Sequence, residues 1–358
     1  MIRVVIVDDS PVVRNVFEQS LNADPEIEVV ATAPDAYVAR DLIVQHQPDV
    51  VVLDIDMPRM DGLTFLKKLM KYYPLPVVIA SGLTDRGSQL ALDALQAGAV
   101  EVVSKGGTKL PGESAAIELL YKVKAAALVD VKRRNAIATA TVATPPPAPA
   151  TRSYGRIASD RLIAIGASTG GTEALEAVLR GLPEDCPPVV IVQHMPAKFT
   201  AQFARRLNGN CRATIAEAQG GERLEQGHVF ICPGDDHMVV MGRSAPYTLS
   251  LRSGPLVNRH RPSVDVLFKS VARSSGSRTV AALLTGMGKD GAQGLLEIRN
   301  TGARTICQDE ATSVVFGMPR EGIEIGAAEF VCPSRTSPAS SWNSRARASA
   351  KPPSGRAA

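Results

Sequence analysis

The chain lacks the features expected of a secreted, membrane-spanning or zinc-knuckle protein. Its five cysteines form no C-x-x-C pair and leave an odd one over, which argues against both a disulfide framework and a zinc site. No apolar run approaches the roughly 18 residues that a membrane span needs. The N-terminal stretch MIRVVIVDDS has no apolar core of the signal-peptide kind. We therefore expect a cytoplasmic protein with reduced thiols and no direct membrane insertion.

A strong excess of one charge sign is also absent. The net charge of +4 is spread along 358 residues, so the composition gives no reason to expect nucleic acid as a partner. What the chain does have is length and apolar content: 358 residues that are 45% hydrophobic suffice for two ordinary domains, each with its own core.

Two series of short apolar runs divide the chain. From Val4 to about Lys124, runs such as VVIVDD, DVVVLDI and LPVVIASG alternate with amphipathic segments. A second series begins at RLIAIGAS, continues through PVVIVQHM, HVFICPG and TVAALLTGMG, and closes with EFVCP. Apolar strands that alternate with helices are typical of a parallel sheet covered on both faces. The sequence therefore predicts an α/β protein with two doubly wound parallel-sheet domains.

The segments outside these series differ in composition. Residues 129–160 contain the stretch PPPAP among Ala and Thr, which predicts an extended linker that joins neither core. Residues 334–358 carry five basic and no acidic side chains, with Trp342 as the one large apolar residue. This composition predicts a disordered tail, either a solvated charged segment or an interaction segment.

Acidic and phosphate-binding residue types follow the strands of the first series. The neighbouring strands of a doubly wound sheet share one crevice at their carboxyl ends, where side chains from distant parts of the chain converge. A single aspartate at such a position is often only a helix cap, but the coincidence of five positions favours a site. The carboxylates suit Mg²⁺, and an oxygen of Asp54 would then attack an incoming phosphoryl group. The residues are Asp8, Asp9, Asp54 and Asp56 as metal ligands, with Ser81 and Lys105 as phosphoryl contacts.

The same residues resemble those of response-regulator receiver domains. The Asp8 and Asp9 pair, the LDIDMPRMDG block, the hydroxyl of Ser81 and Lys105 all match the receiver pattern. The resemblance implies that a histidine kinase is the phosphoryl donor, that Asp54 is the acceptor and that Mg²⁺ is the cofactor.

The second series opens with a possible nucleophile. GASTG, from Gly166 to Gly170, fits the G-x-S-x-G pattern of a serine on a sharp turn between a strand and a helix. There the Thr169 N–H would lie at a helix N-terminus, ready to donate to an oxyanion. The pattern alone is weak, because glycine-rich turns also bind nucleotides. However, Ser168 replaces the second glycine of a dinucleotide site, and no lysine follows as in a P-loop.

A serine nucleophile needs a base and an acid that orients it. Of five histidines, His194 directly follows the apolar run PVVIVQ, at the same expected sheet edge as Ser168. Asp290 follows another apolar run and a glycine-rich turn. Taken singly, His194 would more often be a strand-end residue and Asp290 a helix cap. Their coincidence with Ser168 favours catalysis, in the chain order Ser, His, Asp.

Six sequence blocks then resemble the catalytic domain of chemotaxis receptor methylesterases. They are IGASTGGTEAL, QHMPAKFTAQFARRLN, PGDDHM, NRHRPSVDVLF, LLTGMGKDGAQGL and QDEATSVVFGMPREG. The resemblance implies a flavodoxin-like receiver at 1–128, the linker at 129–160, a Rossmann-like esterase domain at 161–333 and the tail at 334–358. It also implies a triad of Ser168, His194 and Asp290, with oxyanion donors at Thr169 and Met287.

The function implied by the resemblance is hydrolysis of glutamate methyl esters on chemoreceptors, with release of methanol, and deamidation of selected receptor glutamines. The esterase needs no cofactor, the partners are methylated receptors and a chemotaxis histidine kinase, and we expect a monomer. The receiver is expected to cover the esterase cleft until it is phosphorylated. Two alternatives remain: a receiver-linked transcriptional regulator, for which no basic recognition helix is present, and a receiver-linked nucleotide-binding protein.

Overall fold

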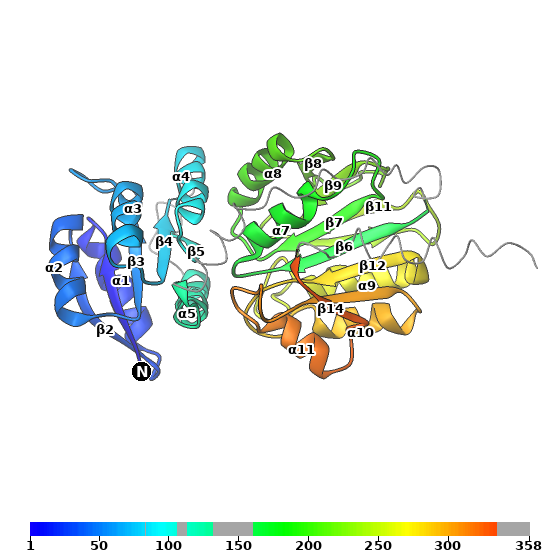
Figure 1. Cartoon of the computed structure of the whole chain (residues 1–358). Coiled ribbons are helices and arrows are strands. Elements are labelled where there is room, and N and C mark those ends of the chain that lie inside the picture. The colour runs from blue at the N-terminus through cyan, green and yellow to red at the C-terminus, as the bar shows by residue number, and fades with distance from the viewer. Residues whose placement is uncertain (83, 106–112, 132–159, 335–358) are drawn as a thin grey trace, which may run out of the picture.

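A computed structural model describes residues 1–82, 84–105, 113–131 and 160–334, and it contains two parallel α/β units (Figure 1). This confirms the predicted fold class. The proline-rich core of the predicted linker and residues 335–358 of the predicted tail lie outside the described residues. No helix in the described part of the chain is long and apolar enough to cross a membrane.

The first unit has a five-stranded sheet with the order β2-β1-β3-β4-β5, all neighbours parallel. Its strand order reverses between β1 and β3, and this creates a crevice at the carboxyl ends of the strands. The strands are β1 (Ile2–Val7), β2 (Ile27–Ala33), β3 (Val50–Asp54), β4 (Val77–Ser81) and β5 (Glu101–Ser104). The helices are α1 (Pro11–Asn22), α2 (Ala36–His46), α3 (Gly62–Tyr72), α4 (Asp85–Gln96) and α5 (Glu113–Ala127).

Side-chain caps fix where four of these helices begin. Ser10, Asp35, Asp61 and Thr84 each accept a hydrogen bond from a backbone N–H of the first turn of α1, α2, α3 and α4. Such a cap satisfies a donor that the helix itself leaves unpaired and stabilises it by about 1 kcal/mol. The polar residues between a strand and the next helix are thus of two kinds, helix caps and residues of the crevice. The structure, and not the sequence, distinguishes the two kinds.

The second unit has a seven-stranded parallel sheet with the order β14-β13-β12-β6-β7-β9-β8. A separate antiparallel pair, β10 with β11, lies beside it. The strands are β6 (Leu162–Ala167), β7 (Val189–Gln193), β8 (Thr214–Glu217), β9 (His228–Ile231), β10 (His237–Met241), β11 (Thr248–Arg252), β12 (Thr279–Leu283), β13 (Arg304–Gln308) and β14 (Phe330–Cys332). The helices are α7 (Gly171–Arg180), α8 (Phe199–Asn210), α9 (Val264–Ser274), α10 (Ala292–Asn300) and α11 (Met318–Glu324).

The central strand β6 packs against a different core on each face of the sheet. Ile163 and Ile165 belong to a buried cluster with side chains of α7 and α8, whereas Leu162 and Ala164 belong to one with side chains of α9 and α10. This follows from the two-residue period of a strand. The order of strands reverses between β6 and β12, so the crevice of this sheet opens where those two strands end.

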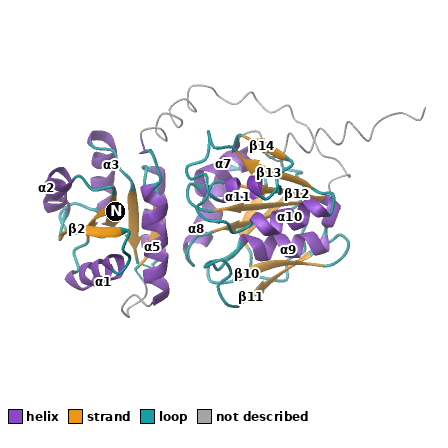
Figure 2. Cartoon of the chain, turned by 90° about the horizontal axis from the view of Figure 1, so that it is seen from below, coloured by secondary structure: helices purple, strands orange, loops and turns teal. Residues whose placement is uncertain are grey.

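Helices α4 and α5 of the first unit lie on the side that faces the second unit (Figure 1), and Figure 2 shows α5 beside it. Helix α4 packs against α8 of the second unit, where Arg206 donates a hydrogen bond to the carbonyl of Leu92 at 3.4 Å. Helix α5 faces the loops that follow β12 and β13, from which Met287 and Val315 join a cluster that includes Leu119 and Val123. The first unit therefore lies against the carboxyl-end crevice of the second.

Candidate active site

Ser168 lies on the turn between β6 and α7, as the GASTG pattern predicts. Its N–H donates to the Thr285 carbonyl at 2.9 Å, and its carbonyl accepts from the Gly171 N–H at 2.7 Å. A Cβ on Gly286 would lie 2.6 Å from the Cβ of Ser168, so the loop after β12 approaches the serine as closely as only glycine permits. The residue is buried, with 3% of its surface exposed.

His194 occupies the equivalent position on the neighbouring strand. The register pairs Ala167 with Gln193, so the next residues, Ser168 and His194, leave adjacent strands side by side. The His194 Nε2 atom lies 2.9 Å from Oδ2 of Asp290, while its Nδ1 is buried and has no hydrogen-bond partner among the described residues. With the proton on Nε2 shared with the carboxylate, Nδ1 is left as the acceptor nitrogen.

Asp290 is held by an unusually complete set of donors. Its Oδ2 accepts from His194 and, at 2.6 Å, from the N–H of Val264. Its Oδ1 accepts from the Asn258 side chain at 2.7 Å, from the Ser263 hydroxyl at 2.8 Å and from the Asp265 N–H at 3.3 Å. Two of these donors belong to the first turn of α9, where the helix dipole favours a negative charge.

These donors outweigh the cost of burying a charge. Burial opposes ionisation of Asp290, but the hydrogen bond and charge of His194, together with the side chains of Asn258 and Ser263, keep the pKa of its carboxyl below the usual range. Asp290 is therefore an anion that orients and balances the imidazole of His194.

A second histidine lies on His194. The rings of His194 and His260 are stacked, with centroids 3.7 Å apart and planes 13° from parallel. Burial, followed by the neighbouring His194, lowers the pKa of His260 well below its ordinary value. Tyr121 of α5 also meets His260, edge-on, with ring centroids 4.9 Å apart. The side chains of Asn258, Ser263 and His260 were absent from the site predicted from sequence.

The two predicted oxyanion donors come from different loops. Thr169 lies just before α7, and the peptide that carries its N–H is oriented through the Ser168 carbonyl, which accepts from the Gly171 N–H at 2.7 Å and from the Gln193 side chain at 2.9 Å. Met287 lies on the loop after β12, and its carbonyl accepts from the hydroxyl of Tyr121. The peptide that carries the Met287 N–H is oriented through the Gly286 carbonyl, which accepts from the N–H groups of Gly317 and Met318 at 3.0 and 2.8 Å. The Tyr121 contact holds the next peptide of the same loop.

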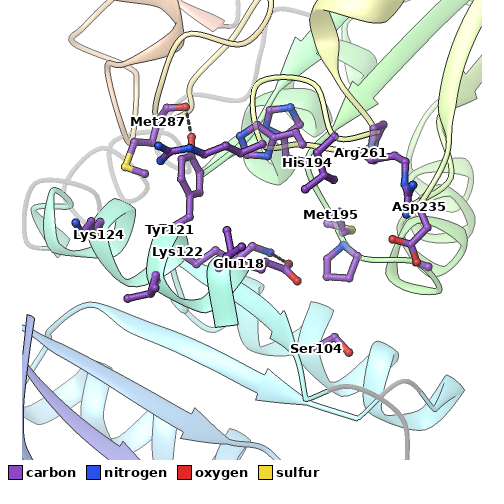
Figure 3. A pocket seen from close by; sticks show the side chains of 18 of the residues that line it. Ser104, Glu118, Tyr121, Lys122, Lys124, His194, Met195, Asp235, Arg261 and Met287 are labelled. Carbon is purple, nitrogen blue, oxygen red and sulfur yellow. Dashed lines mark hydrogen bonds and ion pairs between the residues drawn. The ribbon is translucent and has the colours of Figure 1, made fainter. Parts of the chain in front are cut away.

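A cavity of about 740 Å³ lies between α5 and the second unit (Figure 3). Its lining includes Tyr121, Lys122, His194, Met195, His260 and Met287. The labelled side chains of α5 and of the second unit face one another across it. Ser168 is not among the described residues that line this cavity, and it is buried beside it in this arrangement.

The predicted phosphoryl-acceptor residues meet at the crevice of the first unit. Lys105 Nζ lies 2.6 Å from Oδ1 of Asp54 and 2.7 Å from Oδ2 of Asp8. Carboxylate oxygens of Asp8, Asp9 and Asp54 lie within 4.8 Å of one another. The Asp56 N–H donates to Oδ1 of Asp54 at 3.1 Å, but the Asp56 side chain is exposed and outside this cluster. Ser81 is fully buried at the end of β4.

The Asp54 carboxylate has an incomplete set of hydrogen-bond partners. Burial raises the pKa of Asp54, helped by the negative charge of Asp8 and opposed by Lys105. The pKa of Lys105 is raised because the two carboxylates outweigh its own burial. Oδ2 of Asp54 is buried and has no hydrogen-bond partner among the described residues. Three converging carboxylates with such an orphaned oxygen fit a hard divalent cation such as Mg²⁺.

The two folds and their sites define a class: a two-domain α/β protein in which an acidic receiver pocket is joined to a hydrolase-type serine, histidine and aspartate cluster. Comparison with protein families agrees. Residues 4–110 match the response regulator receiver domain, and residues 163–339 match the CheB methylesterase family.

Named relatives cover nearly the whole chain. A protein-glutamate methylesterase/protein-glutamine glutaminase of Anaeromyxobacter dehalogenans is 50% identical over 93% of this chain and 92% of its own length. One from Pseudomonas aeruginosa is 51% identical over 93% of each chain. The solved catalytic domain of Thermotoga maritima CheB is 39% identical, with a TM-score of 0.48 over 50% of this chain and 95% of that one. The chain belongs to the protein-glutamate methylesterase/protein-glutamine glutaminase family, as the sequence motifs predicted.

Proposed function

We propose that this protein hydrolyses methyl esters of glutamate side chains in chemoreceptors, and deamidates selected receptor glutamines, by acyl transfer to Ser168. The observation that carries the proposal is the buried pair of His194 and Asp290, 2.9 Å apart, in which His194 follows the strand next to that of Ser168. We also propose the division into a receiver at 1–128, a linker at 129–160, a catalytic domain at 161–333 and a tail at 334–358.

Acylation begins with proton transfer. Nδ1 of His194 takes the proton of Ser168 while Oγ attacks the carbonyl carbon of the glutamyl ester, and the Asp290 anion stabilises the imidazolium that forms. The ester C–O bond then breaks, His194 returns the proton to the leaving oxygen, and methanol departs. The glutamyl group is left as an ester of Ser168.

Deacylation repeats these steps with water as the nucleophile. The N–H groups of Thr169 and Met287 are the proposed donors to the oxyanion of both tetrahedral intermediates. A glutamine side chain passes through the same acyl-enzyme, with ammonia as the leaving group. Both activities therefore use one site and need no cofactor in the catalytic domain.

Regulation is proposed to start at Asp54. Asp8, Asp9 and Asp54 would hold Mg²⁺, which shields the negative charge of the incoming phosphoryl group. An oxygen of Asp54 accepts the phosphoryl group, and Lys105 and Ser81 bind its oxygens. The proposed donor is a chemotaxis histidine kinase. Because α5 lies across the cleft, phosphorylation must loosen this contact before a receptor segment reaches Ser168.

Methanol release from a methylated receptor fragment tests this proposal. The wild-type protein, Ser168→Ala and the matched surface control Ser253→Ala are compared, each with and without Mg²⁺ and a small phosphoryl donor. We expect release by the wild type and by Ser253→Ala, stimulation by the donor, and no release above background by Ser168→Ala. Undiminished release by Ser168→Ala would refute the nucleophile.

A further inference from the structure

The histidine and the aspartate of the site are both touched by one short turn, residues 257–260. The N–H of Val257 donates to the His260 carbonyl at 3.0 Å, and the N–H of His260 returns a bond to the Val257 carbonyl at 2.9 Å. The two residues between them, Asn258 and Arg259, have left-handed φ angles of 52° and 70°. Two consecutive non-glycine residues rarely adopt this conformation, and such outliers are concentrated at functional sites.

The conformation places the Asn258 amide between two buried carboxylates. Its Nδ2 atom lies 2.7 Å from Oδ1 of Asp290 and 2.8 Å from Oδ2 of Asp265. Asp265 is tied in turn to the N–H of Gly294 at 2.7 Å. One NH₂ group thus supplies a hydrogen bond to each carboxylate and keeps the two negative groups in a fixed relation.

The other end of the turn places the His260 ring on His194. The parallel contact at 3.7 Å covers one face of the His194 ring, which the Asp290 hydrogen bond alone leaves free to tilt. No described hydrogen bond joins the His260 side chain to His194 or Asp290. The contact is therefore one of packing.

We propose that the 257–260 turn positions the catalytic base: Asn258 fixes the Asp290 carboxylate, and His260 fixes the plane of the His194 ring so that Nδ1 faces Ser168. This inference rests on the proposed function of Ser168, His194 and Asp290. Asn258 and His260 act through other residues and touch no reacting atom in this account.

The turn also bears the contact with the receiver. Tyr121 meets His260 edge-on, and the charges of Lys122 and Arg259 act on the same imidazole. His194 is thus faced by Asp290 and His260 directly, and by these three residues beyond His260. Movement of α5 therefore alters the surroundings of the base through His260 as well as opening the cleft.

Replacing Asn258 by glycine tests the contribution of the side-chain amide alone. Glycine accepts the φ of 52° without strain, so Asn258→Gly removes the side chain and keeps the turn. Gln47→Gly, at a φ of 46° in the receiver, is the matched control. In the full-length protein with phosphoryl donor, we expect Asn258→Gly to lower kcat on the order of tenfold with little change in KM, because the aspartate loses a positioning bond. Gln47→Gly should retain the wild-type kcat.

Aspartate at position 258 tests the same contact through charge. Asn258→Asp adds a carboxylate beside Asp290 and Asp265, which stabilises the protonated form of His194. The midpoint of the rising limb of kcat/KM should therefore move to higher pH by about one unit. A role confined to folding would lower the amount of active protein but leave this midpoint unchanged.

A pair of substitutions at His260 separates packing from proton transfer. Phe keeps a flat ring on His194 but carries no titratable nitrogen, whereas Ala removes the contact. We expect His260→Phe to keep kcat within about threefold and His260→Ala to lower it on the order of thirtyfold, with KM little changed in both.

Three results would overturn the inference: equal kcat for Asn258→Gly and the wild type, an unmoved pH midpoint in Asn258→Asp, or equal losses in His260→Phe and His260→Ala. All variants are compared with a wild-type protein that releases methanol and with Ser168→Ala, which should not. If Ser168→Ala retains activity, the proposed function fails; if only the turn variants behave like wild type, the inference alone fails.

Discussion

Two aspartates of this protein are equally buried but have opposite electrostatic environments. Asp54 in the receiver and Asp290 in the catalytic domain expose 2% and 1% of their surfaces. Burial dominates at Asp54 and raises its pKa, whereas donors dominate at Asp290 and lower its pKa. Asp290 accepts five hydrogen bonds. The donors are the imidazole of His194, the side chains of Asn258 and Ser263, and the N–H groups of Val264 and Asp265. Asp54 has Lys105 and one backbone N–H, and one of its oxygens has no described partner.

Burial alone therefore does not define the role of a carboxylate. A saturated carboxylate has no oxygen left to react, so Asp290 is suited to orienting an imidazole. An under-solvated carboxylate is reactive once a cation offsets its charge, so Asp54 is suited to accepting a phosphoryl group.

The largest expected effect follows from the saturated site. Asp290→Asn replaces one acceptor oxygen by an NH₂ group that His194 cannot pair with in the required tautomer. We expect kcat for methanol release to fall roughly 10³–10⁴-fold. Steady-state kinetics on the phosphorylated protein measures this, and a loss smaller than tenfold would show that Asp290 does not orient the base.

Replacing the two carboxylates should change the melting temperature in opposite directions. Asp290, with its lowered pKa, stabilises the fold above the ordinary value of 3.8, and this stability is lost as the pH falls through the folded pKa. Asp54, with its raised pKa, contributes most to the stability of the fold at low pH, where it is protonated. This contribution is lost as the pH rises through the folded pKa. At pH 7 we expect Asp290→Asn to lower Tm by about 10 °C and Asp54→Asn to raise it by about 2–4 °C.

Calorimetry from pH 7 down to about pH 4 tests this difference of sign. The Asp54→Asn shift should shrink as the pH falls, because protonation removes the charge that burial destabilises. The Asp290→Asn shift should persist to pH 4, because Asp290 loses its charge only below its ordinary pKa. Shifts of the same sign at pH 7 would contradict the comparison.

Of these two carboxylates, only Asp54 should respond to Mg²⁺. Because the cation would bind Asp8, Asp9 and Asp54, millimolar Mg²⁺ should raise the Tm of the wild type by about 2 °C and that of Asp54→Asn much less. Asp290→Asn should respond to Mg²⁺ as the wild type does. Equal responses of Asp54→Asn and the wild type would place the cation elsewhere.

The smallest expected effect concerns the contact between the two regions. Tyr121→Phe keeps the ring against His260 but removes the hydroxyl that donates to the Met287 carbonyl. Loss of one such bond, worth about 1 kcal/mol, should raise methanol release without phosphoryl donor about twofold to fivefold. Release with donor should change little. A lower basal rate would show that this bond does not restrain the catalytic loop.

Site residues could be predicted from the sequence where a reactive side chain follows a strand. Ser168, His194 and Asp290 each follow a parallel strand, so local pattern and topology sufficed to predict that they share a crevice, and the structure brings His194 and Asp290 into contact. The acidic pocket was predictable for the same reason. The side chain of Asp56 lies outside the carboxylate cluster, because adjacent pattern positions do not determine which atoms converge.

Residues that act across the fold were not predictable in this way. Asn258 and Ser263 lie about thirty positions from Asp290 in a loop without a strong pattern, and Tyr121 comes from the other domain. Strands β8, β10, β11 and β13 were also missed. Most of these strands are short or carry polar residues. In TIAE and TLSLR, exposed or half-buried positions interrupt the buried ones, and RTICQ ends in a buried glutamine.

We propose that the receiver pocket controls access to a nucleophilic Ser168. The most direct test is the rate at which a small serine-reactive phosphonate labels Ser168, located by peptide mass spectrometry, with and without Mg²⁺ and phosphoryl donor. We predict slow labelling of the resting protein, where Ser168 is 3% exposed, and faster labelling with donor in the wild type but not in Asp54→Asn. Equal labelling rates with and without donor, or modification of a residue other than Ser168, would contradict the account.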